Sequence, residues 1–246
     1  MSEFSLEPLN ITPAEFLRSF FDPAERVCLR VFSDKPDSAF SGQKLECEMW
    51  QFDDYAKILK AHNEQGRGVY FVINYGGHED ADIKRINAHF MECDNISLEE
   101  QLSQIQAFSL EPSLIVKTRK SLHCYWLIRD GKTKNFRRVQ RKLAMQFNAD
   151  PACINESRVF RVPGFYHCKE EPMMVECVKF NPEIRYSQAE LESTLPDIPN
   201  DSEYEDTYYI PSPVRDRGTQ KGLTIVGRSN TARRMRKRSV SRTGMP

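Results

Sequence analysis

The stretch Asn87-Ala-His-Phe-Met-Glu-Cys-Asp94 decides how the rest of the chain is interpreted. Its apolar content predicts a strand, in which Phe90, Glu92 and Asp94 share one face. Two neighbouring carboxylates stay ionised only where cations neutralise them, and Mg²⁺ prefers oxygen ligands of this kind. The stretch therefore predicts either a metal site at the end of a central strand or a strand that runs into an acidic turn.

Composition sets broad limits on the fold and on the cellular compartment. The chain has 246 residues, of which 39% are hydrophobic, and this suits one domain with a tail. Apolar runs stay well short of the roughly 18 residues that cross a membrane, and the N-terminus lacks the layout of a signal peptide. The seven cysteines include no C-x-x-C pair, so we expect reduced thiols, a cytoplasmic location and no membrane partner.

Helix and strand signals are interspersed along the chain. Capping boxes predict helix starts at Thr12-Pro-Ala-Glu15, Ser97-Leu-Glu-Glu100 and Ser187-Gln-Ala-Glu190. Further helices are expected over residues 53–63 and 133–147. Apolar segments predict strands at residues 27–32, 69–74, 87–94, 113–118, 122–128, 158–162 and 173–178. Because short turns join some neighbouring strands, this order predicts an α+β or α/β domain with a partly antiparallel sheet.

Charge is segregated at the C-terminus, although the formal net charge is zero. Residues 196–246 are acidic at first and then basic, contain several prolines and lack apolar periodicity, which predicts a disordered or linker tail. Its basic part is typical of segments that bind nucleic acid. The residues concerned are Arg233, Arg234, Arg236, Lys237 and Arg238.

The segment around Ser121-Leu-His123 is a second candidate site. Ser121 and His123 share one face of the predicted strand, and Arg119 and Lys120 precede them. A histidine in this basic setting could bind a phosphate group. The alternative is a surface histidine on a half-exposed strand.

The third candidate is Arg158-Val-Phe-Arg-Val-Pro-Gly-Phe-Tyr-His-Cys-Lys169. Arg161, His167 and Lys169 place cations around a Pro-Gly turn, which suits a triphosphate or a nucleic-acid backbone. Arg158 and Arg161 fall on opposite faces of a regular strand, so both reach one site only if the strand bends or ends between them.

The two His-Cys pairs do not fit the usual spacing of a zinc site. His123-Cys124 and His167-Cys168 are adjacent residues that face apart on a strand, and zinc ligands usually come in pairs at spacings of two to four. Cys93 and Cys153 are further candidates without such spacing. A P-loop and the zinc deaminase pattern are also missing.

The order Glu92-x-Asp94, Ser121-x-His123 and then the Arg158–Lys169 segment resembles the archaeo-eukaryotic primase superfamily, and most of all its RepB-like branch of plasmids and phages. The resemblance covers about residues 69–178. It implies an RRM-like mixed sheet flanked by helices, packed beside a second small α/β unit. We therefore expect a catalytic domain over residues 1–195, with an N-terminal unit over about 1–68 and a motif-bearing core over about 69–180.

The resemblance also implies roles for residues. Glu92 and Asp94 would be catalytic residues that bind two Mg²⁺ or Mn²⁺ ions, with His123 as a third catalytic residue. Nucleotide binding would involve Ser121, His123, Arg158, Arg161 and Lys169, and nucleic-acid binding Arg119, Lys120, His167 and the basic tail. A third acid is expected shortly before Arg158, but Asn155 stands there. Glu156 is the first substitute and Asp150 the alternative.

These roles predict a primase or primase-polymerase that makes primers from NTPs or dNTPs on single-stranded DNA. A replicative helicase, encoded separately or in a missing C-terminal domain, is a further expected partner. The alternative is a catalytically degenerate module that binds single-stranded nucleic acid in a replication complex, and Asn155 favours it slightly.

Overall fold

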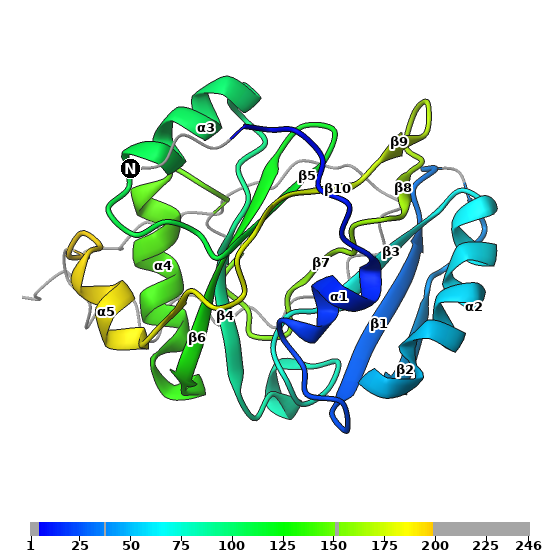
Figure 1. Cartoon of the computed structure of the whole chain (residues 1–246), viewed down its shortest axis with the longest axis horizontal. Coiled ribbons are helices and arrows are strands. Elements are labelled where there is room, and N and C mark those ends of the chain that lie inside the picture. Colours follow the sequence, from blue (N-terminus) through cyan, green and yellow to red (C-terminus); the bar gives the residue numbers. More distant parts are fainter. Residues whose placement is uncertain (1–4, 37, 151–152, 199–246) are drawn as a thin grey trace, which may run out of the picture.

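Two sheets lie at the centre of the fold, with most helices on their outer faces (Figure 1). The computed structural model describes residues 5–36, 38–150 and 153–198. Within these residues the chain has the mixed α+β fold with antiparallel strands that the sequence predicts.

The first sheet has the strand order β2-β1-β3-β7, and every neighbouring pair is antiparallel. Its strands are β1 (Arg26–Ser33), β2 (Gln43–Glu48), β3 (Arg67–Val72) and β7 (Val159–Arg161). The helical segments of this part are α1 (Pro13–Arg18), η1 (Met49–Gln51) and α2 (Phe52–Glu64). Because β3 and β7 belong to this sheet, the expected division near residue 68 does not coincide with a boundary between the sheets.

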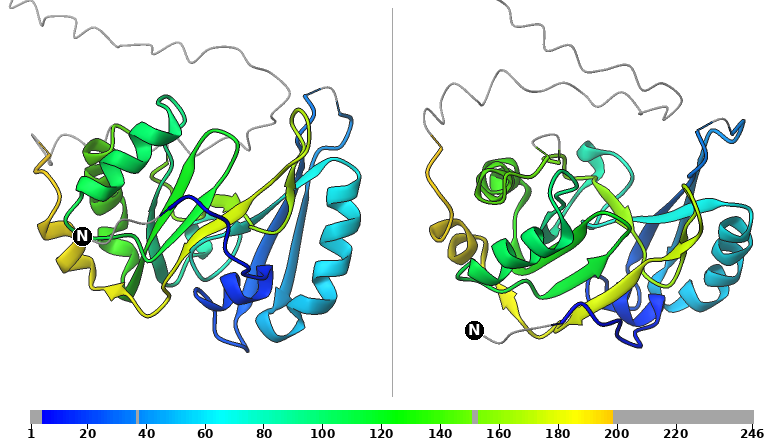
Figure 2. Two further views of the ribbon diagram at one scale, coloured as in Figure 1. Left: turned by 45° about the horizontal axis from the view of Figure 1, so that its top comes forward. Right: turned by 90° about the horizontal axis from the view of Figure 1, so that it is seen from above.

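The second sheet is built around the long strand β6 (Leu122–Gly131). Its other strands are β4 (Ile86–Met91), β5 (Leu114–Lys117), β10 (Glu176–Phe180) and β11 (Arg185–Tyr186). Strand β11 runs parallel to β6, while β4 and β5 pair with β6 in the antiparallel sense. Its helices are α3 (Leu98–Ala107), η3 (Thr133–Asn135), α4 (Phe136–Gln146) and α5 (Gln188–Ser193). Figure 2 shows them on the side of this sheet away from the first sheet.

Several short elements differ from the sequence expectation. Strands β2 and β11, the hairpin of β8 (Tyr166–His167) and β9 (Met173–Met174), and the turn η2 (Asp80–Asp82) were not predicted. The strand expected at 173–178 is divided at Val175 into β9 and β10. The strand expected at 87–94 ends at Met91, so Glu92 and Asp94 lie in the loop that follows it.

A shared core fixes the two sheets to each other. Phe71 on β3 and Tyr125 on β6 are both fully buried, and Phe16 of α1 packs edge-on against each at 5.7 and 5.8 Å between ring centroids. The stripe predicted for the helix at 133–147, namely Phe136, Val139, Leu143 and Phe147, is buried as expected. Residues at the facing ends of the two sheets are therefore held in a defined arrangement.

Other sequence expectations concern the membrane and the tail. None of the helices in the described ranges is long and apolar enough to cross a membrane. All seven cysteines are free and buried. Most of the predicted tail, including the basic group from Arg233 to Arg238, lies outside the described residues, so its disorder and its nucleic-acid binding stay predictions.

Candidate active site

Strand pairing brings the first two motifs together. In the antiparallel pair of β4 and β6, Met91 lies opposite Cys124. Glu92 directly follows the last residue of β4, and His123 directly precedes Cys124 on β6, so the end of β4 meets the start of β6. The carboxylate Oε2 of Glu92 lies 3.3 Å from Nε2 of His123.

His123 is held in place on a buried surface. Only 5% of the residue is exposed, and its ring lies 4.4 Å from the ring of Phe160 on β7, between centroids. The alternative of a surface histidine is therefore wrong. Its second ring nitrogen, Nδ1, has no hydrogen-bond partner among the described residues. Glu92 thus meets an imidazole whose position is fixed by packing.

Arg158 joins the same cluster from the segment before β7. Its Nη2 lies 3.5 Å from Oε1 of Glu92 and 3.7 Å from Oδ2 of Asp150. The thiol of Cys153 also lies 3.4 Å from Oε1 of Glu92 and contacts the Arg158 guanidinium. Three segments that are far apart in sequence therefore converge on the Glu92 carboxylate.

Electrostatics keep this carboxylate ionised. Burial works to raise the pKa of Glu92, but its hydrogen bond and charge interaction with His123, together with Arg158, lower the pKa to about 2. Burial works to lower the pKa of Arg158, yet Cys153, Glu92 and Asp150 raise it above its ordinary value. At neutral pH the cluster therefore presents a charged carboxylate beside a charged guanidinium.

Asp94 lies at a more exposed place than Glu92. It lines an open hollow of about 640 Å³ together with Arg119, Lys120 and residues 95–98 and 100. Thr118 closes the turn that carries Arg119 and Lys120. Its Oγ1 donates a hydrogen bond to the carbonyl oxygen of Ser121 at 2.9 Å and accepts one from the N–H of Ser121 at 3.2 Å. Ser121 itself is 3% exposed. The hollow is therefore lined by two carboxylates, Asp94 and Glu100, and by two cations, Arg119 and Lys120.

Glu156 lies in a separate ion-pair network. The guanidinium of Arg137 binds its carboxylate at 2.8 to 3.1 Å and also reaches Asp80 at 3.1 Å. Asp150, by contrast, shares Arg158 with Glu92. Of the two candidates for the third acid, Asp150 is thus the one in contact with the Glu92 cluster. The neighbouring Asn155 has a buried Oδ1 with no hydrogen-bond partner among the described residues.

Arg161 is not brought together with Glu92. Its guanidinium forms a bidentate pair with Asp34 at 2.7 and 3.1 Å, and the side chain of Asp34 is only 2% exposed. Burial works to raise the pKa of Asp34, but the hydrogen bonds and charge of Arg161 hold it below its ordinary value. Arg158 and Arg161 thus bind different partners, as strand alternation suggests for opposite faces.

His167 and Lys169 lie on the same side as Arg161. Burial and then the charge of Arg161 lower the pKa of His167 to about 4, and Arg119 and Lys169 lower it further against the opposing effect of Asp34. His167 is half-buried, whereas Lys169 is exposed. The neutral imidazole of His167 therefore lies in the field of three cationic side chains, a setting suited to an anion.

Sequence reasoning missed Asp34, Arg137 and Cys153 as members of these networks. Asp34 and Arg137 contact partners that no short-range pattern links to them, since their partners lie in distant segments. Strand alternation is the one sequence signal that bears on these networks, because it places Arg158 and Arg161 on opposite faces of a strand.

The donor chemistry at Glu92 and Asp94 fits a hard divalent cation. Both offer carboxylate oxygens. The carboxylate of Glu92 is ionised, and Asp94 is exposed to solvent. Glu92 and Asp94 do not belong to a group of three potential ligands in the part of the chain that the structure describes. The one group there whose ligand atoms all lie within 4.8 Å of one another is Cys28, Glu46 and His78.

Comparison with known proteins gives one family match. Residues 78–195 match the family described as the RepB DNA-primase N-terminal domain. The matched range contains Glu92, Asp94, His123 and Arg158. No significant match is found among curated proteins.

Solved structures resemble the fold. The AEP domain of the cyanophage S-2L primase-polymerase has a TM-score of 0.65 and 24% identity, covering 74% of this chain and 95% of that one. The primase RepB′ has a TM-score of 0.56 and 21% identity, covering 72% and 58%. The catalytic domain of RepB′ in complex with initiator DNA has a TM-score of 0.56 and 20% identity, covering 72% and 87%. The expected archaeo-eukaryotic primase fold is therefore confirmed.

Proposed function

The chain contains a RepB-like primase domain with the archaeo-eukaryotic primase fold, and from this premise we propose that it synthesises primers on single-stranded DNA. The observation that carries the proposal is the meeting of Glu92, His123 and Arg158 at 3.3 and 3.5 Å. These residues come from the three motifs of the primase resemblance, and each motif alone is weak.

In the proposed reaction, the 3′-hydroxyl oxygen of one nucleotide attacks the α-phosphorus of the next nucleoside triphosphate. The new O–P bond forms as the bond between the α-phosphorus and its bridging oxygen breaks, and pyrophosphate leaves. The hydroxyl proton passes to solvent. Such a transfer relies on positioning and on neutralising phosphate charge rather than on a covalent intermediate.

Each motif has a distinct part in this proposal. Glu92 and Asp94 hold divalent metal, with Asp150 as the third acid in place of Glu156. Two Mg²⁺ or Mn²⁺ ions bound there would supply charge neutralisation at the attacking and leaving oxygens. His123 and Arg158, which contact Glu92, would bind triphosphate oxygens. Ser121 and Lys169 contribute at the edge of the nucleotide site.

Single-stranded DNA is the proposed template. Arg119 and Lys120 line the hollow beside Asp94, and His167 lies in the field of Arg119 and Lys169. This arrangement places cations along a path from the carboxylates to the β8–β9 hairpin, where a phosphate backbone would be neutralised. The complex of RepB′ with initiator DNA supports DNA as the partner. The buried Arg161 acts through Asp34 to position the hairpin rather than by touching nucleotide.

A second candidate is a DNA-binding module of the same fold without catalysis. It is favoured by the engagement of Glu156 with Arg137 and by the lack of a third ligand near Glu92 within the described residues. Such a module would bind single strands with steep salt dependence but would incorporate no nucleotide.

Primer synthesis with the purified chain distinguishes the two candidates. The assay offers labelled NTPs or dNTPs on a single-stranded DNA template, with Mg²⁺, with Mn²⁺ or with a chelator. We expect labelled oligonucleotides with at least one nucleotide class, and none with the chelator. Template binding without product under every condition would establish the binding module instead.

A further inference from the structure

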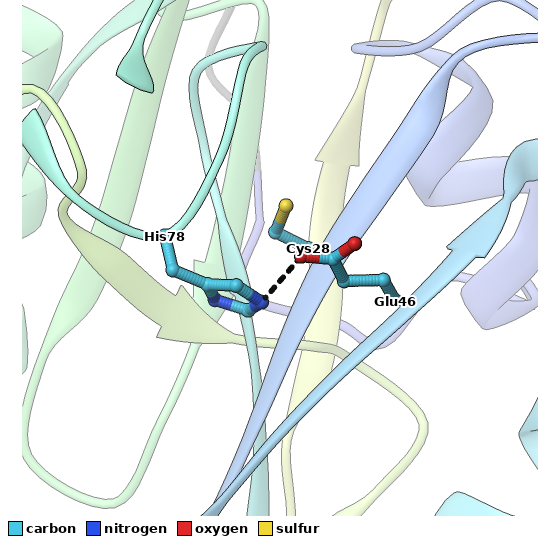
Figure 3. Close-up of side chains that lie close together, drawn as sticks. All are labelled: Cys28, Glu46 and His78. Carbon is cyan, nitrogen blue, oxygen red and sulfur yellow. Dashed lines mark ion pairs between the residues drawn. The ribbon is translucent and has the colours of Figure 1, made fainter. Parts of the chain in front are cut away.

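A second cluster of potential metal ligands lies on the first sheet, among residues that the proposed primase chemistry does not use. Cys28 on β1 and Glu46 on β2 are directly opposite each other in the antiparallel register. His78 comes from the loop between β3 and β4, and its ring points toward Glu46 beside Cys28 (Figure 3). One ligand atom from each of the three lies within 4.8 Å of the other two.

His78 is the unusual member of this cluster. It is only 8% exposed, and neither of its ring nitrogens has a hydrogen-bond partner among the described residues. Nε2 does lie 3.3 Å from Oε1 of Glu46, but without hydrogen-bond geometry. Buried polar groups in native proteins are almost always hydrogen-bonded, so an orphaned imidazole aimed at a thiol and a carboxylate requires an explanation.

We propose that Cys28, Glu46 and His78 bind a zinc ion. A sulfur ligand together with an imidazole favours zinc over magnesium or calcium, which take oxygen ligands. Tetrahedral zinc with bond lengths near 2.1 Å sets neighbouring nitrogen and oxygen ligands about 3.4 Å apart. The observed 3.3 Å between His78 and Glu46 is close to this spacing. A zinc ion would account for the missing hydrogen bond of Nε2, the ring nitrogen that lies near Glu46.

The surroundings leave room for a fourth ligand. Glu46 and His78 line an open hollow of about 510 Å³, which is also lined by Asp82 and by the cationic side chains of Arg26, Lys44 and Lys84. Water would complete the tetrahedron from this side. The thiolate and the carboxylate would together neutralise a divalent ion.

The proposed site is structural. It would fasten the edge strand β2 and its neighbour β1 to the loop that precedes β4. The same loop is already tied to the first sheet by Arg30, whose guanidinium donates to the carbonyl of His78. The zinc therefore adds a cross-link on the first sheet and does not depend on the Glu92 cluster of the second sheet.

Cobalt(II) titration of the metal-free full-length protein tests this site. Tetrahedral cobalt bound to a thiolate gives a near-ultraviolet charge-transfer band and intense visible bands. We expect both bands with the wild-type chain and with Cys47→Ser and Cys153→Ser, and their loss with Cys28→Ser. Cys47 adjoins Glu46 but is not in the cluster, and Cys153 adjoins Glu92.

A second measurement covers a failure of Cys28→Ser to fold. Glu46 is exposed, so Glu46→Gln should fold, and it should weaken zinc binding measured by calorimetry at least about tenfold. His78→Asn should weaken it as well, while Glu48→Gln on the same strand should not. No thiolate band in the wild type, or equal zinc affinity in Glu46→Gln, His78→Asn and the wild type, would overturn the proposal.

Discussion

Oε2 of Glu92 lies 3.3 Å from Nε2 of His123, at the point where the end of β4 meets the start of β6. The sequence around either residue alone does not identify the other as its partner. The antiparallel register alone sets them side by side, and Arg158 then closes the cluster from the first sheet.

The third acid can be identified by comparing two isosteric changes. Asp150 shares Arg158 with Glu92, whereas Glu156 is bound by Arg137. Asp150→Asn should therefore lower nucleotide incorporation at least about tenfold, a cost common among metal-site residues. Glu156→Gln should lower the free energy of unfolding, because it breaks the ion pair with Arg137. At a temperature where this variant is folded, it should lower incorporation less than Asp150→Asn does. The opposite ranking in a steady-state incorporation assay would assign the third acid to Glu156.

Asp34 and Arg161 should be important for stability. Their side chains are 2% and 9% exposed, so Asp34→Asn leaves a buried guanidinium without its counter-charge. Breaking one side of a buried pair costs about 3 to 5 kcal/mol in the free energy of unfolding. Urea denaturation measures this cost. The control is Asp54→Asn, which breaks the exposed pair with Lys57 and should change the free energy of unfolding far less than Asp34→Asn does. Equal effects of the two changes would contradict the assignment.

Acid should weaken the fold through Glu92. The pKa of Glu92 is about 2 in the folded chain against an ordinary 4.5, because His123 and Arg158 outweigh burial. A lowered folded pKa gives a stabilisation that is present above about pH 4.5 and is lost as the pH falls toward about 2. Its size is roughly 1 to 3 kcal/mol, since one pKa unit corresponds to about 1.4 kcal/mol and the side chain is 30% exposed.

The variant Glu92→Gln isolates this contribution. In urea denaturation at several pH values, the variant should lose less stability than the wild type. The comparison runs from pH 5 down to the lowest pH at which both proteins remain folded. Parallel curves for the two proteins would show that Glu92 is not strongly perturbed.

Lys120 should contribute to template affinity. It is exposed and lies on the hollow beside Asp94. Each phosphate contact to a single strand adds about 0.7 to the slope of log affinity against log salt, so Lys120→Ala should reduce that slope by about 0.7. Fluorescence anisotropy with labelled single-stranded DNA at several salt concentrations measures it. Lys60→Ala, an exposed change on α2, should leave the slope unaltered. An unchanged slope for Lys120→Ala would remove this residue from the template path.

Local signals predicted most of the elements. The capping boxes at Thr12, Ser97 and Ser187 are all formed, each with its glutamate three residues later. Strand β2 was missed because Gln43–Glu48 is an edge strand with only Cys47 fully buried, so it lacks an apolar run. Two-residue strands such as β8 and β11 have too few residues to show a period.

The candidate site was predictable only in part. Motif order suggested that Glu92 and His123 act together, and strand alternation separated Arg158 from Arg161. The Asp34–Arg161 pair depends on tertiary contacts between distant segments, which no local pattern encodes. The Cys28, Glu46 and His78 cluster was missed for a related reason: Cys28 and Glu46 become neighbours only once β2 is recognised and paired with β1.

The central claim is that Glu92 and Asp94 support nucleotidyl transfer, and one measurement tests it most directly. Incorporation of labelled nucleotides on single-stranded DNA is compared between the wild type, the double variant Glu92→Ala and Asp94→Ala, and a control double variant, Asp54→Ala and Glu64→Ala, on the surface of α2. The account predicts incorporation by the wild type and the control and none by the Glu92 and Asp94 variant. Undiminished incorporation by that variant, with its fold confirmed by circular dichroism, would contradict it.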